Sequence, residues 1–212
     1  MKLYSYFRSS AAYRLRIALN IKGLEYEYLP VDLLKAEQKS SDYMALNPQG
    51  LIPAMELPNG ETLGQSVALL EWMEETYPEP ALLPSDPFER ARVRSVVNNI
   101  VCDIHPICNI AVTNYLKEHH GADTDGIIAW YTTWMHRGFQ AVEQVLASNH
   151  ASYCFGEEPG LADVCLVPQV YNARRFDIDL QGFPNILGVV DNCNELPAFR
   201  DAMPEQQPDS TL

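Results

Sequence analysis

The sequence predicts an α/β N-terminal domain followed by an all-α C-terminal domain. Strand and helix patterns mix within residues 1–76, whereas every later regular pattern is helical. Four prolines lie between them, within residues 77–87. Because proline lacks a backbone N–H and has a fixed φ, such a cluster favours an extended linker over a helix. We therefore place the domains at residues 1–78 and 88–212, with a linker at 79–87.

The N-terminal domain begins with a compact strand–helix–strand unit. Lys2 to Tyr6 alternates apolar and polar residues, which is typical of a strand. Apolar residues at helical spacing follow from Ala11 to Ile21, and Gly23 is suited to end that helix. Tyr26 to Val31 predicts the second strand. Two strands joined through a helix in this way are usually parallel and right-handed.

The rest of the first domain predicts a hairpin and a helix. Leu33 to Tyr43 is polar and fits no single element. Ile52 to Leu57 and Glu61 to Leu63 predict two short strands joined by a Pro-Asn-Gly turn. Gln65-Ser66 then opens a helix that runs to about Thr76, with Ser66 as the candidate N-cap.

The second domain predicts four helical stretches. They are Phe88–Lys117, Thr124–Ser148, Gly160–Phe176 and a last stretch within Pro184–Met203. His105-Pro106 interrupts the first of them. Because Pro106 removes a helical hydrogen bond, we expect a kink there.

Charge and targeting signals exclude several classes of partner. The formal charge is −13, so nucleic acid and anionic membranes are poor candidates. The apolar stretches are too short to span a bilayer, and the N-terminus lacks the apolar core of a signal peptide. We therefore expect a cytoplasmic location. Any anion site must be built locally, from arginines or helix N-termini.

The cysteine pattern predicts neither disulfides nor a metal site. The chain has an odd number of cysteines, and their spacing contains no zinc-ligand pattern and no Cys-x-x-Cys motif. We expect buried thiols in a reducing compartment. His119-His120 is a poor metal pair, because adjacent histidines point apart on a helix. The five cysteines all lie in the second half of the chain: Cys102, Cys108, Cys154, Cys165 and Cys193.

Many segments resemble zeta-class glutathione transferases, in the same order over nearly the whole chain. They are Leu3-Tyr4-Ser5-Tyr6-Phe7-Arg8-Ser9-Ser10, Tyr13-Arg14-Leu15-Arg16-Ile17-Ala18-Leu19, Leu46-Asn47-Pro48, Ile52-Pro53, Gln65-Ser66, Leu161-Ala162-Asp163, Leu166-Val167-Pro168-Gln169-Val170, Asn172-Ala173 and Arg175-Phe176. The resemblance implies the glutathione transferase fold, which is an α/β thioredoxin-like N-terminal domain plus an all-α C-terminal domain. It also implies glutathione as cofactor and a homodimer.

The class includes isomerases of small dianionic maleyl-keto acids. The resemblance therefore implies conversion of maleylpyruvate to fumarylpyruvate, with maleylacetoacetate as the alternative substrate. Turning a cis alkene into a trans one needs a temporary single bond, which a thiolate creates by reversible addition. Such a catalyst needs a thiolate, groups that lower the pKa of its thiol, and cations that hold the substrate.

The resemblance assigns the start of the first helix to catalysis. Ser9 would stabilise the thiolate, and Ser10 would help to bind glutathione or substrate. As sequence alone, one of these serines caps the helix. The resemblance also places Ala11 among the residues that contact glutathione. Ala11 stands where the class usually has a cysteine. Because glutathione supplies the thiolate, that cysteine is dispensable for addition, although any secondary role it has is lost.

Further glutathione contacts follow from the resemblance. Ile52-Pro53 matches a cis-proline position whose exposed Ile52 N–H and C=O pair with the cysteinyl backbone of glutathione. Without the resemblance, a trans proline at a strand edge is expected. Gln65 and Ser66 would bind the γ-glutamyl carboxylate at a helix start.

Two arginines match the class as substrate cations. Arg8 and Arg175 would each offer a guanidinium fork to a carboxylate. Arg174 is either a solvated surface residue or an extra cation that favours maleylpyruvate. His105 is either a contact to glutathione or substrate, or a hydrogen-bonded interior histidine. Asn109, one turn on, would share its helix face.

Two other functions remain open. A glutathione-conjugating or dehalogenating transferase would share the serines and the glutathione site. Its acceptors are typically neutral, so it would not need both Arg8 and Arg175. A binding or regulatory protein without catalysis would have no reason to keep Ser9, Ile52-Pro53 and Gln65-Ser66 together.

Overall fold

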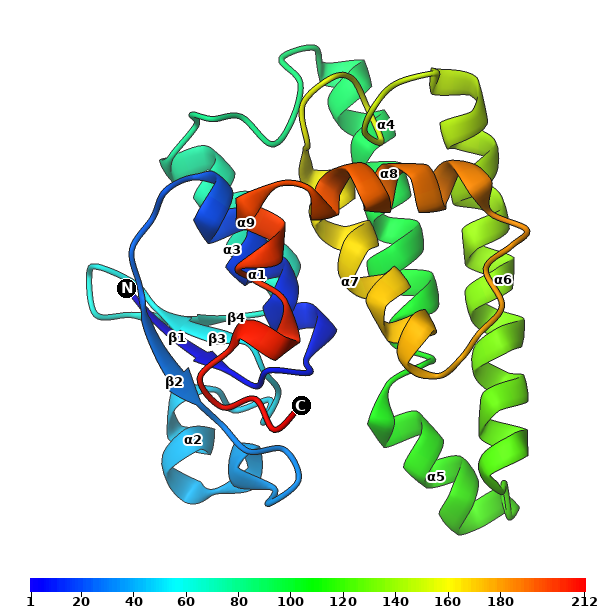
Figure 1. The fold of residues 1–212 in the computed structure, drawn as a ribbon. Coiled ribbons are helices and arrows are strands. Elements are labelled where there is room, and N and C mark those ends of the chain that lie inside the picture. The colour runs from blue at the N-terminus through cyan, green and yellow to red at the C-terminus, as the bar shows by residue number, and fades with distance from the viewer. The chain divides into compact units, whose positions relative to one another are not determined.

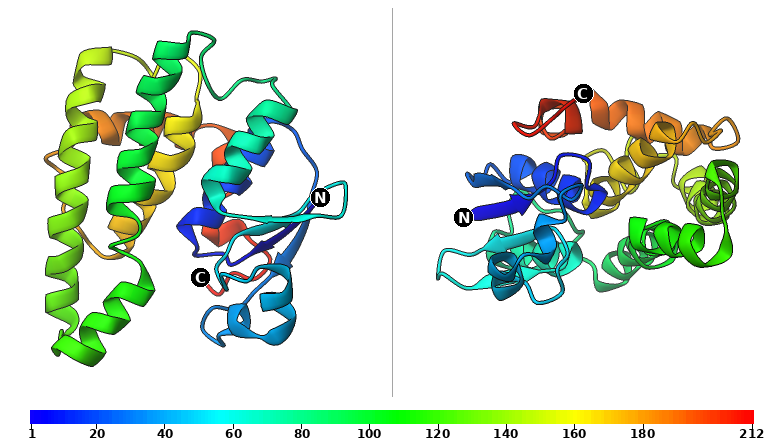
Figure 2. Two further views of the ribbon diagram at one scale, coloured as in Figure 1. Left: turned by 180° about the vertical axis from the view of Figure 1, so that it is seen from behind. Right: turned by 90° about the horizontal axis from the view of Figure 1, so that it is seen from below.

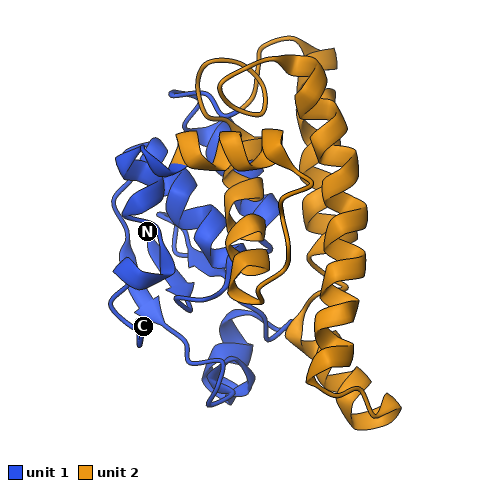
Figure 3. Cartoon of the chain, turned by 45° about the vertical axis from the view of Figure 1, so that its right-hand side comes forward, with its two compact units in different colours: residues 1–82, 194–212 blue, residues 83–193 orange.

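The computed structural model describes residues 1–212, which form two compact units (Figures 1 and 3). Unit 1 comprises Met1–Leu82 and Asn194–Leu212, and unit 2 comprises Leu83–Cys193. This division differs from the predicted domains, because the C-terminal segment packs with the first unit instead of the helical one.

Unit 1 is built on a four-stranded mixed sheet with the order β2-β1-β3-β4. β2 is parallel to β1, β3 is antiparallel to β1, and β4 is antiparallel to β3. The strand–helix–strand unit and the hairpin are therefore confirmed. The strands are β1 (Lys2–Ser5), β2 (Glu27–Pro30), β3 (Ala54–Glu56) and β4 (Thr62–Gly64).

The helices of unit 1 pack around this sheet. α1 lies beside α3 and also contacts α9 (Figure 2). Gly23 follows the C-cap of α1 with φ +62°, a conformation that favours glycine, so the predicted helix end is confirmed. The helices are α1 (Ser10–Ile21), α2 (Ser41–Leu46), α3 (Ser66–Thr76), α9 (Pro197–Arg200) and two 3₁₀ turns, η1 (Glu37–Lys39) and η3 (Pro204–Gln206).

A buried arginine joins α1 to the C-terminal segment. Arg16 is fully buried, and burial lowers its pKa. Its Nε donates to the Ala202 carbonyl at 2.9 Å, and its Nη2 donates to the Phe7 carbonyl at 3.0 Å. Because a buried guanidinium must have its donors satisfied, these contacts fix the C-terminal segment within unit 1.

Unit 2 is helical, as predicted. α4 packs against α7, and the π-helical turn η2 contacts both α6 and α7. None of the helices combines the length with the apolar character that spanning a membrane requires. The helices are α4 (Pro87–Asn98), η2 (Asn99–Ile104), α5 (Ile110–His120), α6 (Thr124–Asn149), α7 (Leu161–Arg175) and α8 (Pro184–Asn194), whose last residue belongs to unit 1.

Two boundaries in unit 2 differ from the prediction. Pro87 is the first residue of α4 rather than part of the linker, because proline needs no N–H partner at that position. The predicted helix Phe88–Lys117 is broken around His105, whose N–H donates to the Ile100 carbonyl at 2.9 Å. This bond spans five residues, so the interruption at His105-Pro106 is confirmed but begins earlier, with a π turn.

The π turn packs directly against the backbone of α6. A Cβ added to Gly138 would overlap the Ile104 side chain. We therefore expect Gly138→Ala to lower the free energy of unfolding by about 1–3 kcal/mol, the usual cost of overpacking. Gly188→Ala in α8 is the control, because a Cβ there meets nothing within 4 Å. It should be neutral or slightly stabilising in the same urea titration. Equal effects would contradict this account of Gly138.

Candidate functional site

The sheet register brings three of the predicted segments to one end of unit 1. Tyr4 of β1 lies opposite Ala54 of β3, which in turn lies opposite Gly64 of β4. The exit of β1, the entry to β3 and the exit of β4 are therefore neighbours. These three points carry the predicted residues Arg8, Ser9, Ser10, Ile52, Pro53, Gln65 and Ser66.

Ser9 is the residue that caps α1. Its Oγ accepts a hydrogen bond from the Ala12 N–H at 3.2 Å. A serine hydroxyl has two acceptor lone pairs and one donor, so capping leaves the O–H free to donate. The capping role and the predicted thiolate role are therefore compatible in Ser9. Ser10 is the first residue of the helix and is only 8% exposed.

Arg8 has the features of a cation that can bind an anion. Its guanidinium carbon lies 5.0 Å from the centroid of the Phe7 ring. Its Nε is buried and has no hydrogen-bond partner in the protein. Because a buried N–H without a partner is costly, this donor fits a site where a bound anion completes the hydrogen bonding.

The peptide bond between Ile52 and Pro53 is cis, which confirms the prediction. The loop before Ile52 is fixed by two hydrogen bonds to the Leu51 carbonyl. Asn47 Nδ2 and the Tyr43 hydroxyl both donate to the Leu51 carbonyl at 2.7 Å. Since Tyr43 and Asn47 are buried, the backbone leading to Ile52 is well fixed.

The start of α3 differs from the prediction. Gln65, not Ser66, is the N-cap, and its φ of +67° turns the chain from β4 into the helix within one residue. Such a φ is rare for a residue with a side chain and is common at functional sites. Gln65 makes no capping bond; its Nε2 donates to Gln49 Oε1 at 2.8 Å. The first turn has no acidic residue, so its N–H groups suit a carboxylate ligand.

Arg14 lies behind Ser66 and was missed by the sequence analysis. Its Nη1 donates to Ser66 Oγ at 3.1 Å, and the residue is only 2% exposed. Since Ser66 accepts this bond, its O–H can donate to a ligand. The signal in the sequence was a charged residue inside the apolar pattern of α1, which is buried continuously from Ala12 to Leu19.

The two arginines at the end of α7 have different surroundings. The Arg175 guanidinium lies 4.4 Å from the centroid of the Phe176 ring. Arg174 Nη2 lies 3.6 Å from Asp191 Oδ1, and both side chains are exposed. Arg174 therefore belongs to a weak surface ion pair, which supports the solvated alternative for this residue.

His105 and Asn109 do not share a helix face. A turn separates them, and Asn109 is the N-cap of α5, with its Oδ1 accepting from the Ala111 N–H at 2.9 Å. The predicted common face is wrong because the π turn and Pro106 end the helix between them. His105 is partly buried, and a role for either residue in binding stays a prediction.

The cysteines are poor thiolate candidates. Four are buried as predicted, but Cys102 is exposed. Burial raises the pKa of Cys108 to about 12, and it also raises the pKa of Cys154 and Cys193. A thiol with a raised pKa is a weak nucleophile at neutral pH. No cysteine lies in unit 1, where the predicted serines are.

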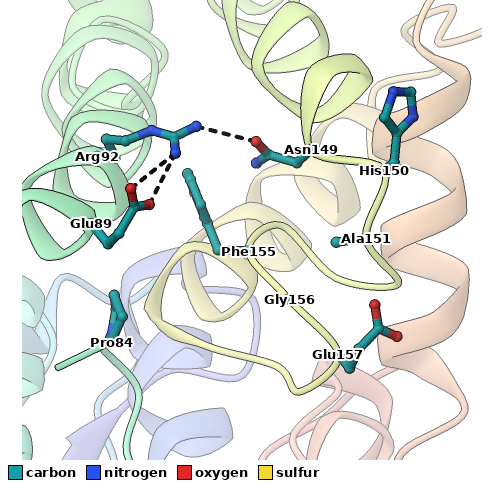
Figure 4. A pocket seen from close by; sticks show the side chains of 9 residues that line it. All are labelled: Pro84, Glu89, Arg92, Asn149, His150, Ala151, Phe155, Gly156 and Glu157. Atoms are coloured by element: carbon teal, nitrogen blue, oxygen red, sulfur yellow. Dashed lines mark hydrogen bonds and ion pairs between the residues drawn. The ribbon is translucent and has the colours of Figure 1, made fainter. Parts of the chain in front are cut away.

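A pocket of about 380 Å³ lies elsewhere, within unit 2 (Figure 4). The guanidinium of Arg92, which lines this pocket, already has partners in the protein. It donates to Glu89 at 2.9 Å and to Asn149 at 3.3 Å. The pocket contains none of the predicted residues. Its lining consists of Pro84, Glu89, Arg92, Asn149, His150, Ala151, Phe155, Gly156 and Glu157.

Family models match parts of both units of the chain, and known proteins match it over nearly its whole length. Residues 8–76 match the glutathione S-transferase N-terminal domain, and residues 132–197 match the corresponding C-terminal domain. A maleylacetoacetate isomerase of Pseudomonas aeruginosa is 49% identical, covering 99% of both chains.

Solved structures of similar isomerases match the whole chain as well. The holo structure of a maleylpyruvate isomerase, described as a zeta-class bacterial glutathione S-transferase, has a TM-score of 0.97 at 50% identity. It covers 100% of both chains. A maleylacetoacetate isomerase from Methylobacterium extorquens, solved with bound malonate and glutathione, has a TM-score of 0.95 at 34% identity and covers 100% of both chains.

Proposed function

Because the chain belongs to the zeta class of the glutathione S-transferase family, we propose that it is a glutathione-dependent cis–trans isomerase of maleyl-keto acids. The reaction is the conversion of maleylpyruvate to fumarylpyruvate, with maleylacetoacetate as the alternative substrate. One observation carries the proposal. A serine-capped helix start, a cis-proline and a helix start without a side-chain capping bond lie at one end of the sheet.

The groups at this end fit glutathione. The uncapped start of α3, with Gln65 and Ser66, suits the γ-glutamyl carboxylate. The Ile52 backbone suits the cysteinyl backbone, and Ser10 and Ala11, at the start of α1, are further candidate contacts. His105 and Asn109 remain further candidate contacts. When bound, glutathione supplies the thiolate that adds reversibly to the alkene, so that the former double bond can rotate.

The chain itself stabilises charge. Ser9 donates its O–H to the thiolate and thereby lowers the pKa of the thiol, and the N-terminus of α1 adds a favourable dipole. Arg8 and Arg175 hold the carboxylates and the oxygen on which negative charge develops. With a formal charge of −13, the protein needs such local cations to bind a dianion.

The full-length matches support both substrates about equally, with 50% identity to a maleylpyruvate isomerase and 49% to a maleylacetoacetate isomerase, and maleylpyruvate is the first substrate to test. Arg174 gives it no support, because its guanidinium pairs with Asp191. The test is kcat/KM for maleylpyruvate and maleylacetoacetate at saturating glutathione. A higher value for maleylacetoacetate would reassign the substrate and leave the reaction class intact.

We also propose a cytoplasmic homodimer, as in the class that the chain belongs to. Its five cysteines form no disulfide, which agrees with a reducing compartment. Sedimentation velocity at micromolar concentration tests the dimer, and cell fractionation tests the location. A monomer at high protein concentration would contradict the first statement.

Replacing all five cysteines with Ala or Ser is expected to leave kcat within about threefold, because none supplies the thiolate. Omitting glutathione is expected to abolish turnover of both the wild type and this variant. The measurement is isomerisation followed by substrate absorbance, with the folded fraction checked by circular dichroism. Full turnover by thoroughly thiol-free enzyme would refute the proposed function.

A further inference from the structure

A carboxylate from the C-terminal segment holds the backbone just before Arg8. Asp209 Oδ2 accepts from the Phe7 N–H at 3.1 Å, although 202 positions separate the two residues. Asp209 Oδ1 accepts from the Tyr28 hydroxyl at 2.6 Å. One side chain therefore ties the exit of β1 to β2. Phe7 lies beyond Ser5, the last paired residue of β1, so no sheet partner would otherwise take its N–H.

The other side of Phe7 is held as firmly. Arg16 Nη2 donates to the Phe7 carbonyl at 3.0 Å, and Arg16 itself is fully buried. The Phe7 ring is 2% exposed and lies against the Arg8 guanidinium. Charged groups thus bond to both the N–H and the C=O of Phe7, and charge-assisted hydrogen bonds of this kind are the strong ones.

This anchoring reaches the proposed catalytic serine. The Ser9 N–H donates to the Tyr6 carbonyl at 2.9 Å, which closes a tight turn around Phe7 and Arg8. Any shift of Phe7 therefore moves Arg8 and Ser9 together. Small displacements of a reacting or stabilising group lower rates strongly, because catalysis depends on its alignment.

We propose that Asp209 is a positioning residue for the Arg8–Ser9 turn, so that the C-terminal segment is part of the catalytic apparatus. The proposal rests on the proposed function only for its effect on turnover. Asp209 touches neither thiol nor substrate in this scheme; it acts through Phe7.

Asp209→Ala tests the proposal, with Asp201→Ala as the matched control. Asp201 lies in the same C-terminal segment, but its side chain is exposed and makes no hydrogen bond. We expect Asp209→Ala to lower kcat by about tenfold or more, the scale of effect that misalignment produces. KM for glutathione should stay within about threefold, because its other contacts are retained. Asp209→Asn should recover part of kcat, since its amide oxygen can still accept from the Phe7 N–H.

Amide hydrogen exchange gives a second readout that needs no glutathione. In Asp209→Ala, exchange should accelerate at residues 7–12 and not in α3. Tyr28→Phe removes a single bond to Asp209 and should change both readouts in the same direction by less, which covers the case that Asp209→Ala fails to fold.

Two failures can be told apart. If the wild type neither binds nor needs glutathione, the proposed function is wrong, and the exchange pattern alone decides the role of Asp209. If kcat and exchange in Asp209→Ala both match Asp201→Ala, or if Tyr28→Phe leaves both unchanged when Asp209→Ala does not fold, the positioning role is overturned.

Discussion

Arg8→Met and Arg175→Met are each expected to lower kcat/KM about 30-fold to 1,000-fold. This corresponds to a loss of roughly 2–4 kcal/mol of transition-state stabilisation. The substrate is a dianion, and the formal charge of −13 opposes its approach. Methionine keeps most of the apolar stem and removes the guanidinium fork. The buried Nε of Arg8 has no partner in the protein, so its hydrogen bond is available to a ligand. The measurement is isomerisation kinetics on maleylpyruvate at saturating glutathione.

The chain supplies a matched control for Arg175. Arg174 is its neighbour on α7, and its guanidinium is engaged in an exposed pair with Asp191. Arg174→Met should therefore leave kcat/KM within about twofold, because exposed pairs contribute little. Lysine at position 8 or 175 should recover only part of the loss, since it cannot bind a carboxylate through two prongs. Glutathione affinity should hardly change.

The outcome also separates two enzyme functions. A conjugating transferase with neutral acceptors would lose little activity in either Met variant. If both variants keep isomerase kcat/KM within twofold, the cations do not hold the dianion. The conjugating transferase then becomes the better account of the same glutathione site.

The order of elements could be predicted because each pattern is local. The strand–helix–strand unit and the helix predicted from Thr124 to Ser148 follow from apolar spacing, and the structure confirms both, with α6 ending one residue later. The N-cap of α3 could not be predicted from spacing. Ser66 has the preferred residue type, but the N-cap position is held by Gln65, whose φ of +67° turns the chain directly from β4 into α3. This turn depends on where β4 ends, which local propensity does not report.

The parts of the site that were missed are long-range. Arg14 and Arg16 look like surface charges by residue type, yet both are buried and hold Ser66 and the Phe7 carbonyl. Asp209 lies in a segment without regular pattern, far from β1 in sequence. A sequence pattern reports periodicity within one element, whereas these contacts depend on how separate elements pack. The resemblance identified the candidate site residues. The register of the sheet explains why seven of them, at the exit of β1, the entry to β3 and the exit of β4, are neighbours.

Ser9→Ala is expected to lower kcat by on the order of a hundredfold or more, the usual cost of removing one donor to a developing or bound anion. The O–H is the part of Ser9 that the helix cap does not use, so it is available to the thiolate. Glutathione binding should weaken much less than kcat falls. The pKa of the bound thiol should rise, which a titration of thiolate absorbance measures directly.

The substitution also removes a helix cap, so its effect on stability must be separated. Ser40 provides the control, because its Oγ caps α2 in the same way, accepting from the Tyr43 N–H at 3.2 Å. Ser40→Ala should lose a similar amount of stability, about 1 kcal/mol, with kcat unchanged. Ser9→Thr keeps both the cap and the O–H, and should retain most of the activity. If Ser9→Ala titrates its bound thiol like the wild type, the hydroxyl of Ser9 is not the stabilising donor. The role then passes to Ser10 or to the backbone N–H groups that open α1.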